Sequence, residues 1–395
     1  MQKFFIQCVI IYTLMRLSRY LLFGMACLSL SSCFKEEPLN AECDIEAAWV
    51  HVDNPGDIFF NITDTLVDVM SAENTIVFTK RPGADVTAMS PRFRLTPGAR
   101  ITPENGSTHD FSDEHVVTYT VTSEDGAWTR TYNVMFAPPK VTLNYDFENY
   151  RLDEQYGKYY VWNEVDNNGN VINDIWATGN PGYFKAKSMT AKPEDYPTVP
   201  MKDGYDGAGV TLTTRSTGAF GMLGGRKMPI AAGNLFLGRF VDEFALTQTL
   251  KATEFGIRFN KEPRTFKGYY KYRPGDVVTN NENKPMVGVR DSAAIYSVLY
   301  LNHDADGNSV VLHGDDVMTN PNIVAVARLW NVRYTDEWTP FEVDFVYRKK
   351  MDYGLMENFG YNIAVVFSSS HNGDIFQGAV GSTLCVDKIS IVCIE

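Results

Sequence analysis

The 395-residue sequence predicts an all-β protein, with an N-terminal immunoglobulin-like sandwich followed by a larger jelly-roll β-sandwich. Short apolar and aromatic runs recur between clusters of Gly, Asn, Asp and Pro, the pattern of strands joined by tight turns. Aromatic residues make up 13% of the chain beside 30 glycines and 18 prolines, which favours packed strands over disorder. The sequence lacks a long segment with the apolar period of an amphipathic helix.

The first 32 residues indicate an export signal that belongs to no fold. Arg16 and Arg19 precede an apolar stretch, residues 20–30, which is too short for a membrane helix of about 20 residues. Residues 30–33, LSSC, resemble the lipobox of bacterial lipoproteins, in which the cysteine becomes the lipidated first residue. We therefore predict a signal peptide at 1–32 and lipidation at Cys33, with the true start at Met1 or Met15.

Residues 33–41 are predicted to be a lipidated tether. Lys35, Glu36 and Glu37 resemble the surface-export signal of outer-membrane lipoproteins in gut glycan-degrading bacteria. This predicts a lipid-anchored outer-membrane protein exposed at the cell surface, and the alternative is a lipoprotein that faces the periplasm. The formal net charge of −12 argues against nucleic acid as a partner, because phosphate binding needs a basic surface.

Residues 42–137 are predicted to form the immunoglobulin-like sandwich. The stretch 117–136 alternates between apolar and polar residues on both sides of the turn at 124–126, which predicts a β-hairpin. Further apolar runs near residues 49–50, 59–62 and 76–78 complete the pattern of a small sandwich. Such a module is expected to act as a spacer without chemistry of its own.

Two prolines in residues 138–140 predict a stiff linker, because proline fixes the backbone and ends the preceding strand. Residues 141–395 are then predicted to form the jelly roll. Its clearest strand signals are residues 266–272, 292–301, 322–330, 341–347, 361–368 and 384–394.

The cysteines downstream of the predicted lipid site indicate neither a disulfide nor zinc. Cys385 and Cys393 lie eight positions apart in one predicted strand, which separates them by roughly 26 Å, whereas a disulfide needs Cα atoms within about 7 Å. Cys43 has no nearby partner in the sequence. None of the three lies in a zinc-ligand spacing.

Five short motifs together resemble a known family. They are WATGN at 176–180, AGNLFLG at 232–238, GYYKY at 268–272, SSS at 368–370 and GSTLCVD at 381–387. In this order they resemble the putative carbohydrate metabolism domain of lipoproteins from gut glycan-degrading bacteria, which often follows an immunoglobulin-like module. The resemblance covers residues 141–395 and implies a jelly roll that binds or cleaves glycans. It carries no established catalytic residues to this chain.

Candidate ligand-binding residues follow from the chemistry of sugars, which present apolar faces and polar edges. Trp176, Asn180 and Tyr183 supply rings and an amide within one Gly/Pro-containing stretch. The alternative is that Trp176 packs inward while Asn180 forms a turn. Tyr270 and Tyr272 share one face of a predicted strand, pointing either to a groove or to the core.

Three further residues are expected to orient a ligand by hydrogen bonds. They are Asn234, Glu254 and Asp291.

A catalytic pair is the alternative that the sequence supports less well. Glu342 and Asp344 resemble the start of the E-x-D-x-x-E strand of jelly-roll β-glucanases, but Tyr347 stands where the second glutamate is needed. A solvent-facing strand face explains the same residues. Catalytic residues are therefore left unassigned, and a glycoside hydrolase remains open through carboxylates on different strands.

No cofactor is predicted. Asn302, Asp304 and Asp306 match the first half of a calcium loop, but His313 stands at its twelfth position in place of the required glutamate. A hairpin tip explains these residues without metal. A structural calcium elsewhere stays open, with no residues assigned to it.

The sequence thus leads to one preferred function and two alternatives. The preferred hypothesis is an outer-membrane lipoprotein whose jelly roll binds a polysaccharide or oligosaccharide and passes it to glycan-import proteins. The first alternative is a glycoside hydrolase on the same fold. The second is an adhesive or fimbria-like structural protein of the cell surface.

Overall fold

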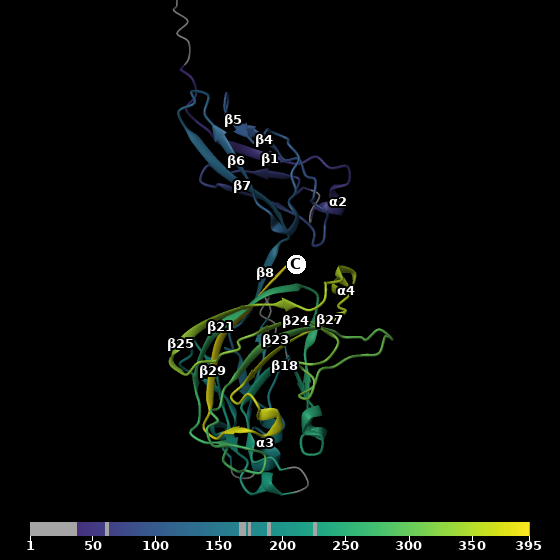
Figure 1. The fold of residues 1–395 in the computed structure, drawn as a ribbon. Coiled ribbons are helices and arrows are strands. Elements are labelled where there is room, and N and C mark those ends of the chain that lie inside the picture. The colour runs from purple at the N-terminus through teal and green to yellow at the C-terminus, as the bar shows by residue number, and fades with distance from the viewer. Residues whose placement is uncertain are drawn as a thin grey trace, which may run out of the picture. The chain divides into compact units, whose positions relative to one another are not determined.

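The computed structural model describes residues 38–59, 63–165, 171–172, 175–187, 191–223 and 227–394. The predicted signal peptide and Cys33 lie outside these ranges. The chain forms two compact units (Figure 1). Within the ranges given, none of the helices is long and apolar enough to cross a bilayer. The first unit contains the described residues up to Asp53, Thr65–Phe78 and Val86–Met135, and the second contains Asn54–Asp64, Thr79–Asp85 and the chain from Phe136.

The N-terminal strands form the predicted immunoglobulin-like sandwich from a three-stranded sheet, β2-β1-β4, and a four-stranded sheet, β3-β7-β6-β5. Tyr119 and Phe93, on opposite sheets, pack edge to face with ring centroids 4.7 Å apart. The strand bounds are β1 (Ile45–Trp49), β2 (Leu66–Asp68), β3 (Thr75–Thr79), β4 (Arg92–Leu95), β5 (Arg100–Thr102), β6 (Val117–Thr122) and β7 (Thr129–Ala137).

The predicted hairpin is formed by β6 and β7, whose paired residues run from Val117 opposite Val134 to Thr122 opposite Thr129. The alternation of the sequence places Trp128 on the same face as Tyr132 and Val134, and the structure differs at this residue. Trp128 precedes β7 and its side chain is exposed, so it lies in the turn and not on the buried face.

The second unit is a sandwich of two antiparallel sheets, as the jelly-roll prediction requires. The larger sheet has the order β13-β18-β27-β23-β24-β26, with β19 beside β18 and β20 beside β27. Its strands are β13 (Trp176–Ala177), β18 (Asn234–Phe240), β19 (Thr253–Phe255), β20 (Ile257–Phe259), β23 (Ala294–Leu301), β24 (Ile323–Arg328), β26 (Val346–Tyr347) and β27 (Tyr361–Ser368).

The smaller sheet has the order β14-β15-β29-β21-β25, with β8 beside β29. Its strands are β8 (Lys140–Tyr145), β14 (Thr198–Met201), β15 (Gly209–Thr213), β21 (Glu262–Arg273), β25 (Thr335–Asp344) and β29 (Thr383–Ile394). Short hairpin pairs and helices complete the unit: β9 (Tyr150–Leu152), β10 (Tyr160–Trp162), β11 (Glu164–Val165), β12 (Val171–Ile172), β16 (Arg215–Ser216), β17 (Ile230–Ala231), β22 (Val278–Thr279), β28 (Gly378–Ala379), α3 (Asn180–Lys187) and α4 (Tyr353–Glu357).

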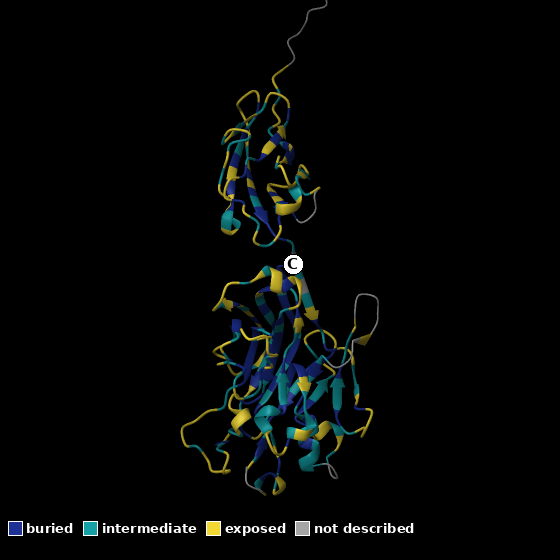
Figure 2. Ribbon diagram, turned by 90° about the vertical axis from the view of Figure 1, so that its right-hand side faces the viewer, coloured by how far each residue is buried: buried dark blue, intermediate teal, exposed yellow. Residues whose placement is uncertain are grey.

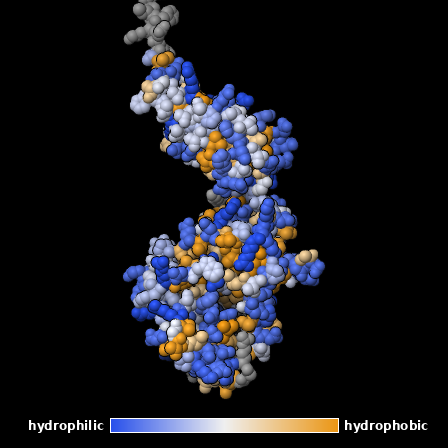
Figure 3. Space-filling view, in the orientation of Figure 1, coloured by the Kyte–Doolittle hydropathy of each residue, from blue (hydrophilic) through white to orange (hydrophobic). Residues whose placement is uncertain are grey.

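The central strands of the larger sheet are buried on both faces. Figure 2 shows the buried residues, in dark blue, gathered in the interior of this unit. On β23, Ile295 and Leu299 point between the two sheets and belong to the main core together with Phe266 of β21. Tyr296 and Val298 point to the opposite, outer face and form a second core cluster. This explains why residues 292–301 form a nearly continuous apolar run, because a strand buried on both faces loses the polar alternation. Figure 3 shows that some hydrophobic side chains also remain on the surface of this unit.

The predicted strand 341–347 is divided between the two sheets. β25 ends at Asp344 and pairs with β21, whereas β26 begins at Val346 and pairs with β24. Glu342 and Tyr347 therefore lie on different sheets. The Tyr347 hydroxyl donates to the Pro263 carbonyl at 2.7 Å, so the resemblance to a β-glucanase strand does not extend to its geometry.

Residues 302–308 form a turn that its own side chains hold closed. The Asp304 carboxylate accepts from the backbone N–H of Asp306 at 3.0 Å and of Asn308 at 2.8 Å. A bridge between His303 and Ser309 closes the hairpin. These are the bonds of an Asx-type turn, which gives Asp304 a structural role in the hairpin.

Candidate functional site

A cavity of about 370 Å³ lies on the outer face of the larger sheet. Its floor consists of two rows of side chains that the strand register places side by side. The first row comes from β18, β27, β23 and β24, and the second from β18, β27 and β23. In order, the rows are Phe236, Val366, Tyr296 and Arg328, then Asn234, Ser368 and Ala294.

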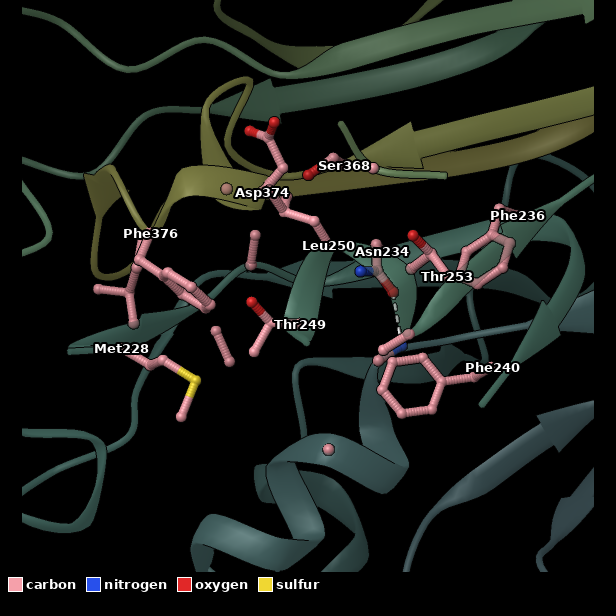
Figure 4. A pocket seen from close by; sticks show the side chains of 18 of the residues that line it. Met228, Asn234, Phe236, Phe240, Thr249, Leu250, Thr253, Ser368, Asp374 and Phe376 are labelled. Atoms are coloured by element: carbon pink, nitrogen blue, oxygen red, sulfur yellow. Dashed lines mark hydrogen bonds between the residues drawn. The ribbon is translucent and has the colours of Figure 1, made fainter. Parts of the chain in front are cut away.

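The walls of the cavity come from five separate segments of the chain, and Figure 4 shows several of their side chains around the opening. Apolar contacts are supplied by Phe220, Phe240, Leu246 and Phe376. Hydroxyl groups are supplied by the threonines at 217, 249, 253 and 319. The combination of apolar walls with a few polar groups is typical of small-molecule sites.

Asn234 presents its amide nitrogen to the cavity. Its Oδ1 accepts from the Gly179 N–H at 2.6 Å, which fixes the orientation of the amide (Figure 4). Its backbone is held by the Thr198 hydroxyl, which donates to the Asn234 carbonyl at 2.8 Å. Within the described part of the chain, Nδ2 of Asn234 has no protein acceptor. It is therefore a pre-positioned hydrogen-bond donor at the floor of the cavity.

Gly233 sets the position of Asn234. A Cβ atom at residue 233 would lie 2.4 Å from the Thr213 backbone nitrogen and 2.5 Å from the Pro197 carbonyl oxygen. These atoms belong to the backbone and cannot rotate away. Glycine is therefore required just before β18, where the backbone passes close to the end of β15 and the start of β14.

Charged side chains lie at the rim of the cavity. The Arg328 guanidinium stacks over the Trp330 ring at 4.1 Å, and its Nη2 lies 3.3 Å from Nε2 of His371. Burial, followed by the Arg328 charge, lowers the pKa of His371 below its usual range. Asp315 and Asp374 also line the cavity, and Asp315 accepts from Lys251 at 3.0 Å.

Two of the eight predicted ligand-binding residues line the cavity: Asn234 and Tyr183. The Tyr183 hydroxyl donates to the Ser216 carbonyl at 3.4 Å, and its ring lies within the wall formed by α3. The structure brings these two residues together from segments about 50 positions apart.

Trp176 lies inside the sandwich, as the alternative interpretation predicted, and this corrects its assignment as a ligand-binding residue. Its side chain is 5% exposed, and the rings of Tyr145 and Phe147 each lie 5.3 Å from it, centroid to centroid. The indole Nε1 donates to the Glu164 carboxyl at 2.6 Å. Burial raises the pKa of Glu164 to about 7.

Asn180, Tyr270 and Tyr272 are also structural. Asn180 is fully buried; its Nδ2 donates to the Thr198 carbonyl at 2.7 Å, and its Oδ1 accepts from the Thr198 N–H at 3.1 Å. Tyr270 and Tyr272 belong to the core between the sheets. Their rings offer no surface to a ligand, because the side of β21 that faces the other sheet is sealed.

The two predicted carboxylates are occupied by protein partners outside the cavity. Glu254 forms an ion pair with Arg239. Asp291 accepts from the hydroxyls of Ser370 at 2.6 Å and Ser382 at 2.7 Å and from the Ala379 N–H at 2.7 Å. The serine motifs near 370 and 382 therefore hold loops together around one half-buried carboxylate.

Sequence reasoning missed Arg328, Phe240 and Leu246. Arg328 had a detectable signal, because it is the one charged residue in the apolar run 322–330. Leu246 had none, since its place over the sheet depends on the path of the connection between β18 and β19. Phe240 is the last residue of β18, and its local pattern gave no sign of a cavity beside it.

Comparison with known proteins agrees with this architecture. Residues 146–392 match the family described as putative carbohydrate metabolism domain, and residues 58–135 match the family described as SGBP, N-terminal. A search of curated proteins found no match.

Two solved structures are similar over most of their length. One is described as a putative glycoside hydrolase from Bacteroides thetaiotaomicron; it is 37% identical over 91% of this chain and 99% of its own, with a TM-score of 0.59. The other, a putative glycoside hydrolase from Bacteroides vulgatus, is 36% identical over 63% of this chain and 97% of its own, with a TM-score of 0.57. With its sandwich fold, its motifs and a family match over residues 146–392, this chain belongs to the family of the putative carbohydrate metabolism domain.

Proposed function

We propose that this chain is a cell-surface glycan-binding protein and that the cavity on the larger sheet holds the saccharide. The observation that carries the proposal is the cavity itself, with an apolar floor and walls and an oriented amide donor from Asn234. A saccharide needs this combination, because its C–H faces pack on apolar side chains while its hydroxyls require hydrogen-bond partners. Membership of a carbohydrate-related family supports the proposal.

The proposed location is the outer surface of the outer membrane, with a lipid anchor at Cys33. Support comes from the LSSC sequence at residues 30–33 and from the match of residues 58–135 to the N-terminal domain of surface glycan-binding proteins. In this proposal the bound glycan passes on to import proteins in the same membrane. Loss of membrane attachment in a Cys33→Ala variant, measured by cell fractionation, tests the anchor.

Glycan binding is tested with a soluble chain that begins at Ala41. A glycan array identifies ligands, and titration calorimetry then compares Leu246→Ala with Leu355→Ala. Leu246 lines the cavity and is 40% exposed, whereas Leu355 lies on α4 away from it and is 43% exposed. We expect Leu246→Ala to weaken binding by about 3- to 10-fold through lost apolar contact, with no change in the control.

Two outcomes would contradict the proposal. Equal weakening by both variants would place the binding site elsewhere. Silence across all glycans, together with capture of a cell-surface protein, would favour the adhesive alternative.

Hydrolysis is the second candidate function, since the two similar structures are described as putative glycoside hydrolases. Asp315 and Asp374 are the carboxylates that line the cavity within the described residues. Hydrolysis requires one carboxyl to donate a proton and another to act as nucleophile or base. Release of reducing ends by the wild type, lost in Asp374→Asn without loss of binding, would establish it. Binding with no product would support a purely binding protein.

A further inference from the structure

We propose that the cavity is selective for a saccharide that carries a negative charge, and that Arg328 is the residue that binds the charged group. This inference rests on the proposed glycan-binding function and specifies its ligand as a sugar acid or a sulfated sugar. Both present an oxyanion of similar size, so the structure assigns the shared chemistry and the experiment separates the two.

Arg328 is placed at the cavity by the register of the sheet. It is the last residue of β24 and lies directly opposite Tyr296 of β23, at the end of the first floor row. Its side chain is half-buried. The stacking of the guanidinium on the Trp330 ring occupies one of its flat faces. The N–H groups at its edge remain directed outward from that ring, because guanidinium donors lie in the plane of the group.

The positive charge of Arg328 is not neutralised within the described residues. Its hydrogen-bond partner there is His371, and no carboxylate lies within ion-pair distance of it. Other arginines of the chain do pair with carboxylates, including Arg94, Arg130, Arg239 and Arg264. A half-buried cation without a counter-ion is costly, and an anionic ligand offsets that cost on binding.

The two carboxylates of the cavity interact with groups other than Arg328, so they do not compete with an anionic ligand for it. Asp315 is partnered by Lys251 at 3.0 Å. Asp374 lies three residues from His371, and its negative charge acts on the His371 ring. An anion is therefore expected to bind the N–H groups at the edge of the Arg328 guanidinium and not the turn at 373–375. The Asn234 amide and the apolar floor then remain for the neutral part of the sugar ring.

A carboxylate or sulfate is the group that fits this arrangement. Guanidinium forms two parallel hydrogen bonds to such an oxyanion, a geometry that lysine cannot reproduce. A neutral hydroxyl cannot accept both of these parallel hydrogen bonds from the guanidinium, and it brings no negative charge to the site. Arg328 thus distinguishes acidic from neutral saccharides of the same shape.

The test compares three oligosaccharides of equal length: an oligogalacturonate, a sulfated galactan fragment and a neutral galactan fragment. Binding to the soluble chain from Ala41 is measured by calorimetry at low and high salt for Arg328→Gln, Arg328→Lys and Arg258→Gln. Arg258 is the matched control, because it is an exposed arginine on β20 of the same sheet that does not line the cavity. We expect the wild type to bind one of the two acidic ligands at least about 10-fold more tightly than the neutral one.

Arg328→Gln is expected to remove this preference by a loss of about 10- to 100-fold in affinity for the acidic ligand, with Arg328→Lys intermediate and Arg258→Gln unchanged. Retained binding of the neutral ligand by Arg328→Gln shows that the variant is folded. Equal wild-type affinity for neutral and acidic ligands, or unchanged acidic binding in Arg328→Gln, overturns the inference and leaves glycan binding intact. Failure of the wild type to bind any glycan overturns both proposals.

Discussion

Asn180, the first residue of α3, uses its side chain to make hydrogen bonds that a neighbouring strand would otherwise make. Its side-chain amide makes both hydrogen bonds that a paired residue would make with Thr198. Removal of the amide leaves the Thr198 N–H and C=O groups buried without partners, and each such group costs about 1 to 3 kcal/mol.

We therefore expect Asn180→Ala to lower the free energy of unfolding by roughly 2 to 4 kcal/mol. Denaturant titration of the chain from Ala41 measures this. Asn149→Ala is the control, because the Asn149 side chain is exposed. Equal stability of the two variants would show that Asn180 has no structural role.

Glu164 gives the second unit a dependence on pH. Burial raises its pKa to about 7 in the folded chain, against 4.5 as its ordinary value. The folded state thus binds more protons than the unfolded state between these two pH values, and stability is highest below the lower value and falls as pH rises towards 7.

We expect Glu164→Gln to remove this part of the pH dependence, of order 1 to 3 kcal/mol, while its amide oxygen still accepts from Trp176. Urea unfolding of wild type and variant at pH 5, 6, 7 and 8 checks it. The difference between the two proteins should widen in favour of the variant as pH rises. A constant difference would show that Glu164 titrates normally.

At the residue scale, the sequence indicated the types of residue in the site better than their positions. Trp176 and Asn234 belong to equally suggestive motifs, yet Trp176 faces the space between the sheets and Asn234 the outer face. Strand alternation decides the face of each residue, but the rings that cover Trp176 come from Tyr145 and Phe147, which lie outside its motif in the sequence. Local pattern could not therefore distinguish a core tryptophan from an exposed one.

At the scale of elements, Gly233 is the point where two strands approach too closely for any side chain. We expect Gly233→Ala to cost at least about 3 kcal/mol, because the added Cβ meets backbone atoms on both sides. Gly56→Ala is the control, since a Cβ there has no neighbour within 4 Å. Thermal unfolding compares the two, and a Gly233→Ala protein as stable as the control would contradict the assigned packing.

Most strands of the second unit could be predicted because burial on one or both faces leaves a strong apolar pattern. The transfer of the chain from one sheet to the other at Phe345 could not be predicted. Residues 341–347 alternate without interruption, and only the pairing of β25 with β21 and of β26 with β24 reveals the break. The cavity was equally hidden, since its floor is assembled from β18, β27, β23 and β24, whose order in the sheet differs from their order in the sequence.

At the scale of the whole molecule, the fold does not depend on disulfides within the described residues. Cys43, Cys385 and Cys393 are free thiols. Burial raises the pKa of each of them, to about 12 for Cys393. A raised pKa leaves little thiolate to react at neutral pH.

We expect the folded chain from Ala41 to react slowly with a thiol reagent at pH 7.5 and the denatured chain to show three reactive thiols at once. Addition of reductant should leave the melting temperature unchanged. A single reactive thiol after denaturation without reductant would instead indicate a disulfide between two of the three cysteines.

The architecture separates stability from recognition. Sheet pairing fixes the base of the cavity. Its sides come largely from connections between strands, such as residues 241–252, which take no part in the hydrogen bonds of the sheet. Under the proposed glycan-binding function, exchange of a connection such as residues 241–252 between relatives should therefore alter which sugar is bound while the scaffold still folds. The same proposal predicts that one sandwich serves different glycans by variation of the borders of its cavity alone.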